Sequence, residues 1–203
     1  MWLNNIIFEN REIERERLVL GDEDGLYYLG PKLTLRSCTL VLSVPAKRMI
    51  ISGARFIDCA IEVKQELKNF RWHKGFLKGC RFTGRIKGNV FGIPTDGSQD
   101  AGIEDCDFTG AHLDQCSFLG CDVRTLRFPS WPCFTIFDPV RRWRELSALQ
   151  WPGDIGPVVV EGFAEGPLTE VAVTYSAPDL AKRSGTTPEA IRAVLEKLDG
   201  VKF

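Results

Sequence analysis

The side chains that could do chemistry in this chain are its carboxylates, two histidines and seven cysteines. Paired carboxylates such as Asp105 and Asp107 are the residue type that cleaves glycosidic bonds, so a polysaccharide hydrolase is one alternative. A catalytic triad needs a nucleophile, a base and an orienting group in contact, and no Ser, Cys or Thr here stands in a recognisable nucleophile elbow. His73 is flanked by aromatic and basic residues, and His112 lies near acidic ones. We therefore predict that the protein is not an enzyme.

The cysteines also lack the pattern of a metal site. Cys116 and Cys121 are five positions apart and no His follows them in the sequence, so we do not expect them to be the paired ligands of a zinc knuckle. The segment GCRFTGR at 79–85 superficially resembles a phosphate loop, but it lacks the Lys-Ser/Thr ending. We expect neither a metal nor a cofactor.

Charged residues in the middle of the chain are separated by sign. The range 67–87 carries basic residues and no acidic one, whereas 88–123 carries acidic residues and no basic one. Because opposite charge steers protein association, the acidic set is our candidate surface for a basic protein partner. This acidic wall consists of Asp96, Asp100, Glu104, Asp105, Asp107, Asp114 and Asp122.

The acidic wall lies on an internal repeat with a period of five. From 101 to 130 the chain reads AGIED, CDFTG, AHLDQ, CSFLG, CDVRT and LRFPS, with an apolar residue at the centre of each step. A period of five fits neither a helix nor an ordinary strand, so it indicates a winding chain with one short straight segment and one corner per repeat. The central residues are Ile103, Phe108, Leu113, Phe118, Val123 and Phe128.

Cysteines extend the pattern towards the N-terminus. Cys38, Cys59, Cys80 and Cys106 are each followed two residues later by a bulky apolar residue, which predicts one side of four successive turns. The larger step before Cys106 falls on FGIPTDGSQD, which we interpret as an inserted loop. Stacking Cys80 on Cys106 places Lys78 beside Glu104 and Arg81 beside Asp107, so ion pairs across the stack are expected. No obvious partner is available for four members of the acidic wall, Asp96, Asp100, Asp114 and Asp122.

This register resembles the pentapeptide-repeat family, which carries Leu or Phe at the centre of each repeat and Ala or Cys two residues earlier. The resemblance implies a mainly β fold, a right-handed parallel β-helix with four five-residue sides per coil and both marked positions inward. We expect about five coils over 33–137, an N-terminal cap at 1–32, and an α+β C-terminal cap at 138–203. The resemblance is tight over 101–130 and looser over 33–128.

The expected C-terminal cap contains helical and strand-like segments. Asp138 and Pro139 fit the start of an amphipathic helix at 139–150, and 157–163 and 168–175 are rich in strand-forming residues. The range 177–198 resembles a helix-turn-helix, with Thr187 and Pro188 beginning the second helix. This pair has as many acidic as basic residues, so we expect a structural or protein-contact role, and a DNA-binding regulator is the weaker alternative.

The composition limits the partners. The chain has 203 residues, a formal net charge of −1 and no apolar run long enough for a membrane span, so we expect a cytoplasmic protein that does not bind membranes. The odd number of cysteines, mostly at inward positions, favours a reducing compartment.

We expect a non-catalytic module that binds a protein, such as a bacterial immunity or inhibitor protein that occludes a toxin-like partner. The family also suggests a DNA-mimicking topoisomerase binder as an alternative, although a short rod with mixed charge fits that role less well.

Overall fold

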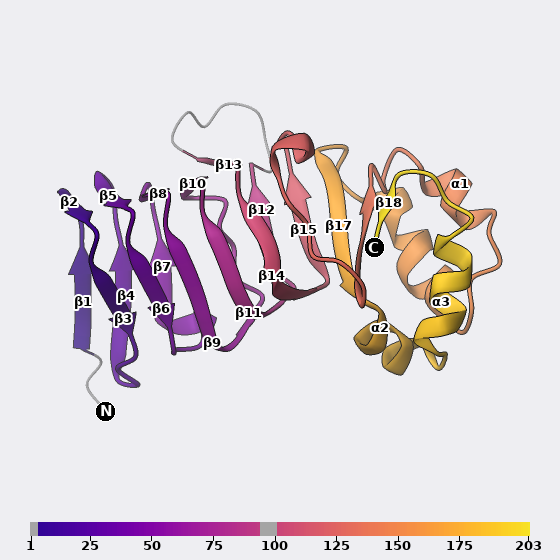
Figure 1. The fold of residues 1–203 in the computed structure, drawn as a ribbon, viewed down its shortest axis with the longest axis horizontal. Helices are drawn as coiled ribbons and strands as arrows, with labels where there is room; N and C mark the ends of the chain where they lie inside the picture. Colours follow the sequence, from indigo (N-terminus) through magenta and orange to yellow (C-terminus); the bar gives the residue numbers. More distant parts are fainter. Residues whose placement is uncertain (1–3, 94–100) are drawn as a thin grey trace.

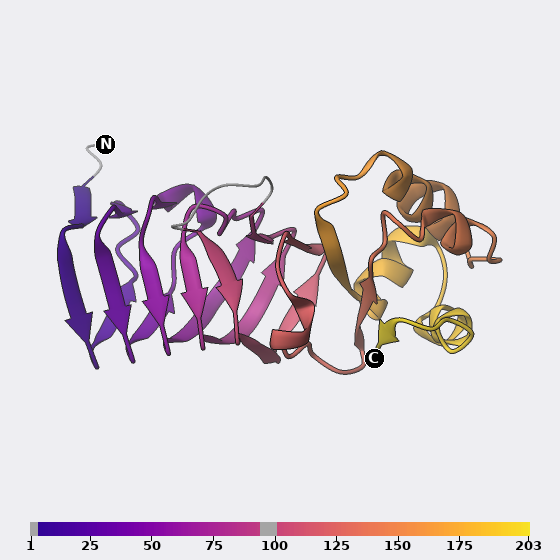
Figure 2. The same ribbon diagram turned by 90° about the horizontal axis from the view of Figure 1, so that it is seen from above.

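The computed structural model describes residues 4–93 and 101–203. It is an elongated stack of parallel strands followed by a smaller helical end, with the N-terminus at the opposite end of the molecule (Figures 1 and 2). The fold is mainly β, and the stacked parallel sheets form a β-solenoid with a few helices at the C-terminus, as predicted.

Three parallel sheets form the sides of the solenoid. Sheet A contains β1 (Asn4–Phe8), β4 (Gly25–Leu29) and β7 (Met49–Ile51). Sheet B contains β2 (Arg11–Glu14), β5 (Leu33–Arg36), β8 (Arg55–Ile57), β10 (Phe76–Lys78) and β13 (Gly102–Glu104). Sheet C contains β3 (Arg17–Leu20), β6 (Thr39–Leu42), β9 (Ala60–Lys68), β11 (Arg81–Lys87) and β14 (Asp107–Asp114). One strand from each sheet follows the other along the chain, so the chain winds.

The solenoid has about four turns, whereas about five were expected. It also begins earlier in the sequence, because β1, β2 and β3 pair in parallel with β4, β5 and β6. Residues 4–32 of the range expected as a cap therefore contribute strands to the first turns and do not form a separate cap. Its dense charge had suggested a cap, but the charged side chains point outward while Ile13 and Leu20 are buried.

The predicted columns of inward side chains are present. Thr39, Ala60, Arg81 and Asp107 are register partners on successive strands, which places the four preceding cysteines in one column. The thiols of Cys59 and Cys80 donate hydrogen bonds to the Leu35 and Phe56 carbonyls of the preceding turn. The apolar core continues through the pentad segment, where all the central residues except Val123 are buried. Phe82 stacks on Phe108 with ring centroids 4.6 Å apart.

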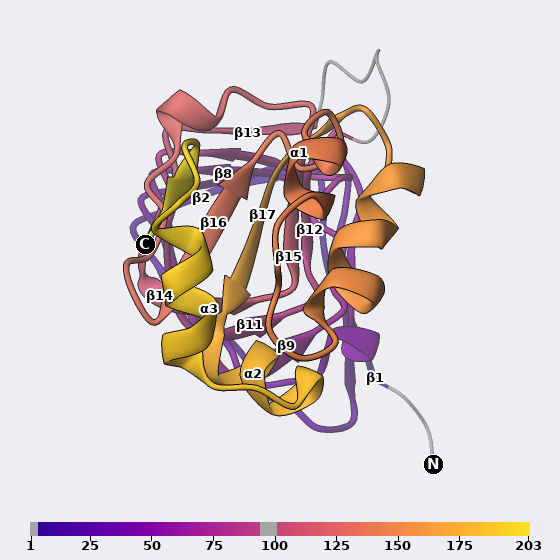
Figure 3. The same ribbon diagram turned by 90° about the vertical axis from the view of Figure 1, so that its right-hand side faces the viewer.

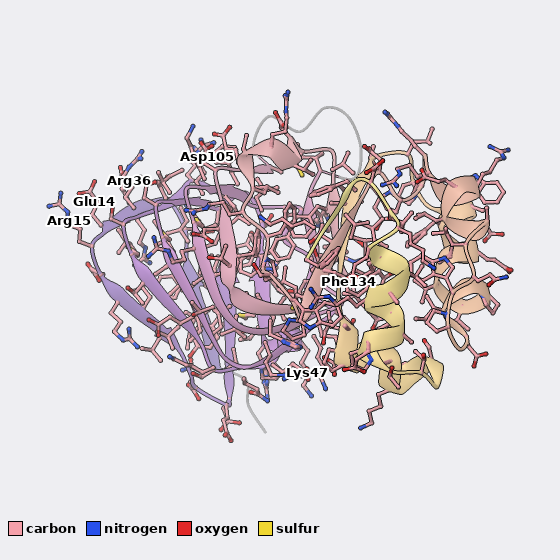
Figure 4. All side chains as sticks on the ribbon, turned by 45° about the vertical axis from the view of Figure 1, so that its right-hand side comes forward. Glu14, Arg15, Arg36, Lys47, Asp105 and Phe134 are labelled. Carbon is pink, nitrogen blue, oxygen red and sulfur yellow. The ribbon has the colours of Figure 1, made fainter. Side chains whose placement is uncertain are left out.

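The corners between sheets B and C use left-handed backbone. Arg15, Ser37, Asp58 and Asp105 all have positive φ, and glycine takes the equivalent corner at Gly79 (φ 63°). Figure 4 shows Arg15 and Asp105 along the same outer edge of the solenoid. A Cβ on Gly79 would lie 2.2 Å from the Asp58 Oδ1 atom, so the close approach of Asp58 as well as the backbone favours glycine there.

A fourth sheet, sheet D, joins the solenoid to the C-terminal cap. Its strands, in spatial order, are β12 (Val90–Gly92), β15 (Cys116–Leu119), β17 (Glu170–Ser176), β16 (Cys133–Phe137) and β18 (Val201–Lys202). The pairing is parallel between β12 and β15 and antiparallel from β15 to β17 onward. Ala172 of β17 belongs to the solenoid core, whereas Val173 and Tyr175 belong to a second core under the helices. Strand β17 is therefore the wall that the two cores share.

The cap helices cover the end of the solenoid (Figure 3). They are α1 (Trp143–Ser147), the π-helix η3 (Gly156–Val160), the 3-10 helix η4 (Glu161–Glu165), α2 (Ala177–Ser184) and α3 (Pro188–Leu195). The α2–α3 pair confirms the expected helix-turn-helix pattern, with Gly185 in left-handed conformation after α2 and the Thr187 side chain capping α3. Single-turn 3-10 helices η1 (Ala46–Arg48) and η2 (Val123–Thr125) lie at corners of the solenoid.

Two sequence-based predictions in the cap were wrong or too long. The range 157–163, expected to be a strand, is helical because Ile155, Val160 and Phe163 are buried from one side at near-helical spacing. Packing against the second core outweighs the strand preference of its valines. The helix expected over 139–150 is only α1, with Leu146 buried.

Replacing Phe108 with Ala removes a ring that contacts Phe82, Phe91 and Phe118, so we expect the free energy of unfolding to fall by about 3–5 kcal/mol. Urea denaturation followed by circular dichroism measures the change. The exposed Arg124→Ala variant in the last turn is the control and should unfold at the wild-type midpoint. A decrease in the free energy of unfolding of less than about 1 kcal/mol for Phe108→Ala would contradict the packing of these rings in the core.

Candidate protein-binding surfaces

The structure separates the members of the acidic wall. Asp96 and Asp100 lie outside the described residues. Glu104 pairs with Lys78 at 2.6 Å, which confirms that predicted ion pair. Asp107 lies beside Arg81 in register but forms its ion pair with Arg127 at 3.6 Å, and the fully exposed Arg124 binds Asp122. Much of the wall is therefore neutralised within the chain.

Asp114 is a buried residue and not a member of an outer wall. Its side chain is only 2% exposed, and its carboxylate accepts hydrogen bonds from both terminal nitrogens of Arg183 at 2.6 and 3.1 Å. Lys87 lies 3.2 Å away, and the backbone N–H of Ser176 also donates to it at 3.3 Å. Sequence reasoning placed Asp114 outside because the repeat predicts an outward side chain, but α2 folds over that position.

A second polar group links the same elements. The His112 Nε2 atom lies 2.9 Å from an Asp179 carboxylate oxygen, and Arg85 lies 3.6 Å from the same oxygen. The hydrogen bond with His112 is the main cause of a lowered pKa of Asp179, so this carboxylate stays ionised beside its partners. His112 thus holds α2 against sheet C. In this contact the imidazole pairs with a carboxylate and not with a nucleophilic side chain.

Two acidic residues, each already paired with a basic residue of the chain, lie together at a surface hollow of about 370 Å³ on the last turn. Glu104 and Asp122 line it with the ring of Phe76, and the half-buried Cys121 is also in the lining. Burial raises the pKa of the Cys121 thiol to about 12, so this cysteine is protonated at neutral pH and a poor nucleophile. Because both carboxylates are already paired, the hollow suits an apolar side chain.

A row of exposed apolar residues on sheet A was missed in the sequence. Ile7 pairs in register with Tyr28, and Tyr28 pairs with Ile50, so the three side chains form one row on the outer face. Ile7 is 50% exposed and Ile50 is 45% exposed, although both are large and apolar. The signal was available in the alternation around Tyr27, Tyr28 and Leu29, but the register across turns was needed to align it. We call this set the sheet A row.

Basic residues lie on the turns that carry and follow the sheet A row. Arg71, exposed, forms a bridge to Val90 on the next turn, and Lys47 and Arg48 lie in η1, which contacts β4. Among the residues that the structure describes, no ion pair is formed by these three side chains. An apolar row with free cations on the same and the following turn is a surface that suits a protein partner.

The helix pair of the cap does not present a basic surface. Arg192 of α3 pairs with Glu196 at 2.9 Å and lies over the rings of Trp131 and Phe203. Arg183 of α2 is held by Asp114. Because phosphate attraction needs free cations, these contacts give little support to DNA binding.

Cys80 and Cys116 are protonated structural residues. Cys106 is the main cause of a raised pKa at Cys80, of about 12, through a hydrogen bond between neighbouring thiols of the column. Burial raises the pKa of Cys116 to about 12 as well. Within 4–93 and 101–203, no group of three or more His, Cys, Asp or Glu side chains is arranged to hold a metal ion.

A comparison of the chain with protein-family models, curated proteins and solved structures finds no match. Within the described part of the chain, no helix is both long and apolar enough to cross a membrane.

Replacing Asp114 with Ala leaves Arg183 and Lys87 without their buried counterion, so we expect the free energy of unfolding to fall by about 2–4 kcal/mol. Chemical denaturation measures it. In the exposed Glu196→Ala control, which breaks the ion pair between Arg192 of α3 and Glu196 at its C-terminal end, the free energy of unfolding should fall by less than about 0.5 kcal/mol.

In the double variant Asp114→Ala/Arg183→Ala, the free energy of unfolding should fall by less than the sum of the decreases in the two single variants, because the double variant removes both charges of the pair. Additive losses would mean that the two side chains do not interact in solution.

Proposed function

We propose that this protein is a non-catalytic binding module that occupies a partner protein with one flat side of its solenoid. The observation that carries this proposal is the sheet A row, in which the exposed Ile7 and Ile50 flank the half-buried Tyr28 on strands held in register by the parallel stack. Exposed apolar rows of this kind cost solubility and are typical of surfaces that become covered. Solenoid proteins bind their partners through a rigid, extended surface, so binding of this kind needs no cleft.

The partner that fits this surface presents apolar side chains opposite the row and acidic side chains opposite Arg71, Lys47 and Arg48. This differs from the basic partner that the acidic wall alone suggested, because Asp114 is buried and other acids are paired. The hollow at Glu104 and Asp122 is a second contact for an apolar side chain. An immunity or inhibitor protein that occludes a partner is the class of function that we propose.

We also infer that the last turns are of the pentapeptide-repeat type. Support comes from the burial of Ile103, Phe108, Leu113 and Phe118 at five-residue intervals, and from the bridge between Asp107 and Arg127, which are twenty residues apart. The family's DNA-mimicking topoisomerase binders would need a long and strongly negative rod. About four turns with neutralised acids favour the occluding module instead.

The test is affinity capture from the native cell with tagged wild-type protein and the variant Ile7→Lys/Ile50→Lys. We expect a stoichiometric protein partner with the wild type and at least about tenfold less with the variant, because two desolvated apolar contacts are lost. The matched control is Val19→Lys, since Val19 is 56% exposed on sheet C of the first turn. It should capture as much partner as the wild type.

Thermal melts of all variants check that each is folded. Absence of any stoichiometric partner, or full retention by Ile7→Lys/Ile50→Lys, would overturn the proposal. A variant Asp105→Lys/Asp122→Lys that alone loses the partner would place the contact on the acidic side instead.

A further inference from the structure

The cap contains a cavity that the binding-module proposal does not use. It has a volume of about 360 Å³ and lies between the end of the solenoid, strand β17 and the helices η3, η4 and α2. This volume is at the lower end of the range for small-molecule sites. Apolar side chains form one part of the lining and polar ones the other. The main ones are Val159, Phe163 and Leu180, and Ser117, Glu170 and Tyr175.

The mouth of the cavity is apolar and open. Val158 is 71% exposed, although it lines the cavity, and Gly162 lies one helical turn further along the same segment. A Cβ added to Gly162 would meet no atom within 4 Å. Among the glycines that the structure describes, it alone combines this open space with a φ that any residue adopts. Neither the backbone conformation nor packing against neighbours requires glycine at position 162. Glycine in place of Ala lowers the stability of a helix by up to about 1 kcal/mol.

Glu170 provides the polar end. A β-bulge between Phe118 and Leu119 in the pairing of β15 with β17 places Glu170 in the same lining as Val173 and Tyr175. Burial raises the pKa of Glu170, and the Ser117 hydroxyl, which donates a hydrogen bond to it, opposes the rise. No lysine, arginine or histidine of the described residues forms an ion pair with this carboxyl group.

The other charged group of the lining is already neutralised. Arg183 reaches the cavity from α2, but both of its terminal nitrogens bind the buried Asp114. An anionic ligand would have to compete with Asp114 for Arg183. A cationic ligand can pair with the Glu170 carboxylate, which forms no ion pair with a described residue. The lining therefore favours a ligand with a positive charge next to Glu170.

We propose that this cavity binds a small organic amine, with its ammonium group on Glu170 and its apolar body against Phe163, Leu180 and the exposed Val158. The Ser117 hydroxyl orients the carboxylate, and Tyr175 closes the inner wall. The site is independent of the sheet A row and lies on the cap.

Isothermal titration calorimetry with 2-phenylethylamine and its neutral counterpart 2-phenylethanol tests the proposal on the whole chain. We expect the amine to bind about tenfold more tightly than the alcohol, because only the amine forms a charge-assisted hydrogen bond. In Glu170→Gln the two affinities should come within about twofold of each other. The exposed Glu189→Gln variant of α3 is the matched control and should keep the wild-type ratio.

Two further variants test the position of the site. Gly162→Leu places a side chain in the open mouth and should weaken both probes by at least about tenfold, whereas Ala164→Leu, exposed in the same helix but outside the lining, should change neither. Equal affinity for amine and alcohol in the wild type, no binding of either at millimolar concentration, or unchanged binding by Gly162→Leu would overturn the proposal. The wild-type comparison needs no variant, so a misfolded variant leaves the test intact.

Discussion

A stack of parallel strands has an unpaired backbone edge at its end, and covering that edge is the constraint on which this structure depends. Here the covering element is β17, which pairs antiparallel with β15 and turns one sheet from a side of the solenoid into the wall of the cap. Because Ala172 of β17 enters the solenoid core whereas Val173 and Tyr175 enter the cap core, one strand ties both together. Asp114 adds a buried charged contact from α2 to the last turn. Edge protection of this kind also opposes end-to-end association.

The stack explains why the outer faces can serve binding. Inward residues are fixed by columns of apolar side chains and stacked rings, and Asn89 satisfies carbonyl groups of Leu67 and Lys87 where the column is interrupted. The outer residues are free of this packing and are placed by register alone. The sheet A row and the hollow at Glu104 therefore share the rigidity of the core without contributing to it.

Local repetition made most of the fold predictable. The period of five, the column of Cys38, Cys59, Cys80 and Cys106, and the α2–α3 pair all follow from spacing that a reader can find in the sequence. Contacts between distant segments were not predictable. The burial of Asp114 depends on Arg183, sixty-nine residues away, and the valines of η3 form a helix because the second core accepts only one of their faces.

The same limit applies to the candidate surfaces. Stacking Cys80 on Cys106 was enough to predict the Lys78–Glu104 pair of the acidic wall, but not the pairing of Asp107 with Arg127 or of Asp114 with Arg183. The sheet A row was hidden because Ile7, Tyr28 and Ile50 are far apart along the chain and meet only through the register of three strands. The first turn was interpreted as a cap because dense charged residues surround Ile13 and Leu20 in the sequence, so that their inward positions were not recognised.

Hydrogen exchange measured on peptides by mass spectrometry tests most directly whether β17 closes the solenoid. The account predicts that residues 116–119 of β15 and 170–176 of β17 exchange together, with the same dependence on denaturant, because they open as one unit. Exchange of 170–176 at the rate of an unstructured peptide, while 116–119 stays protected, would contradict it.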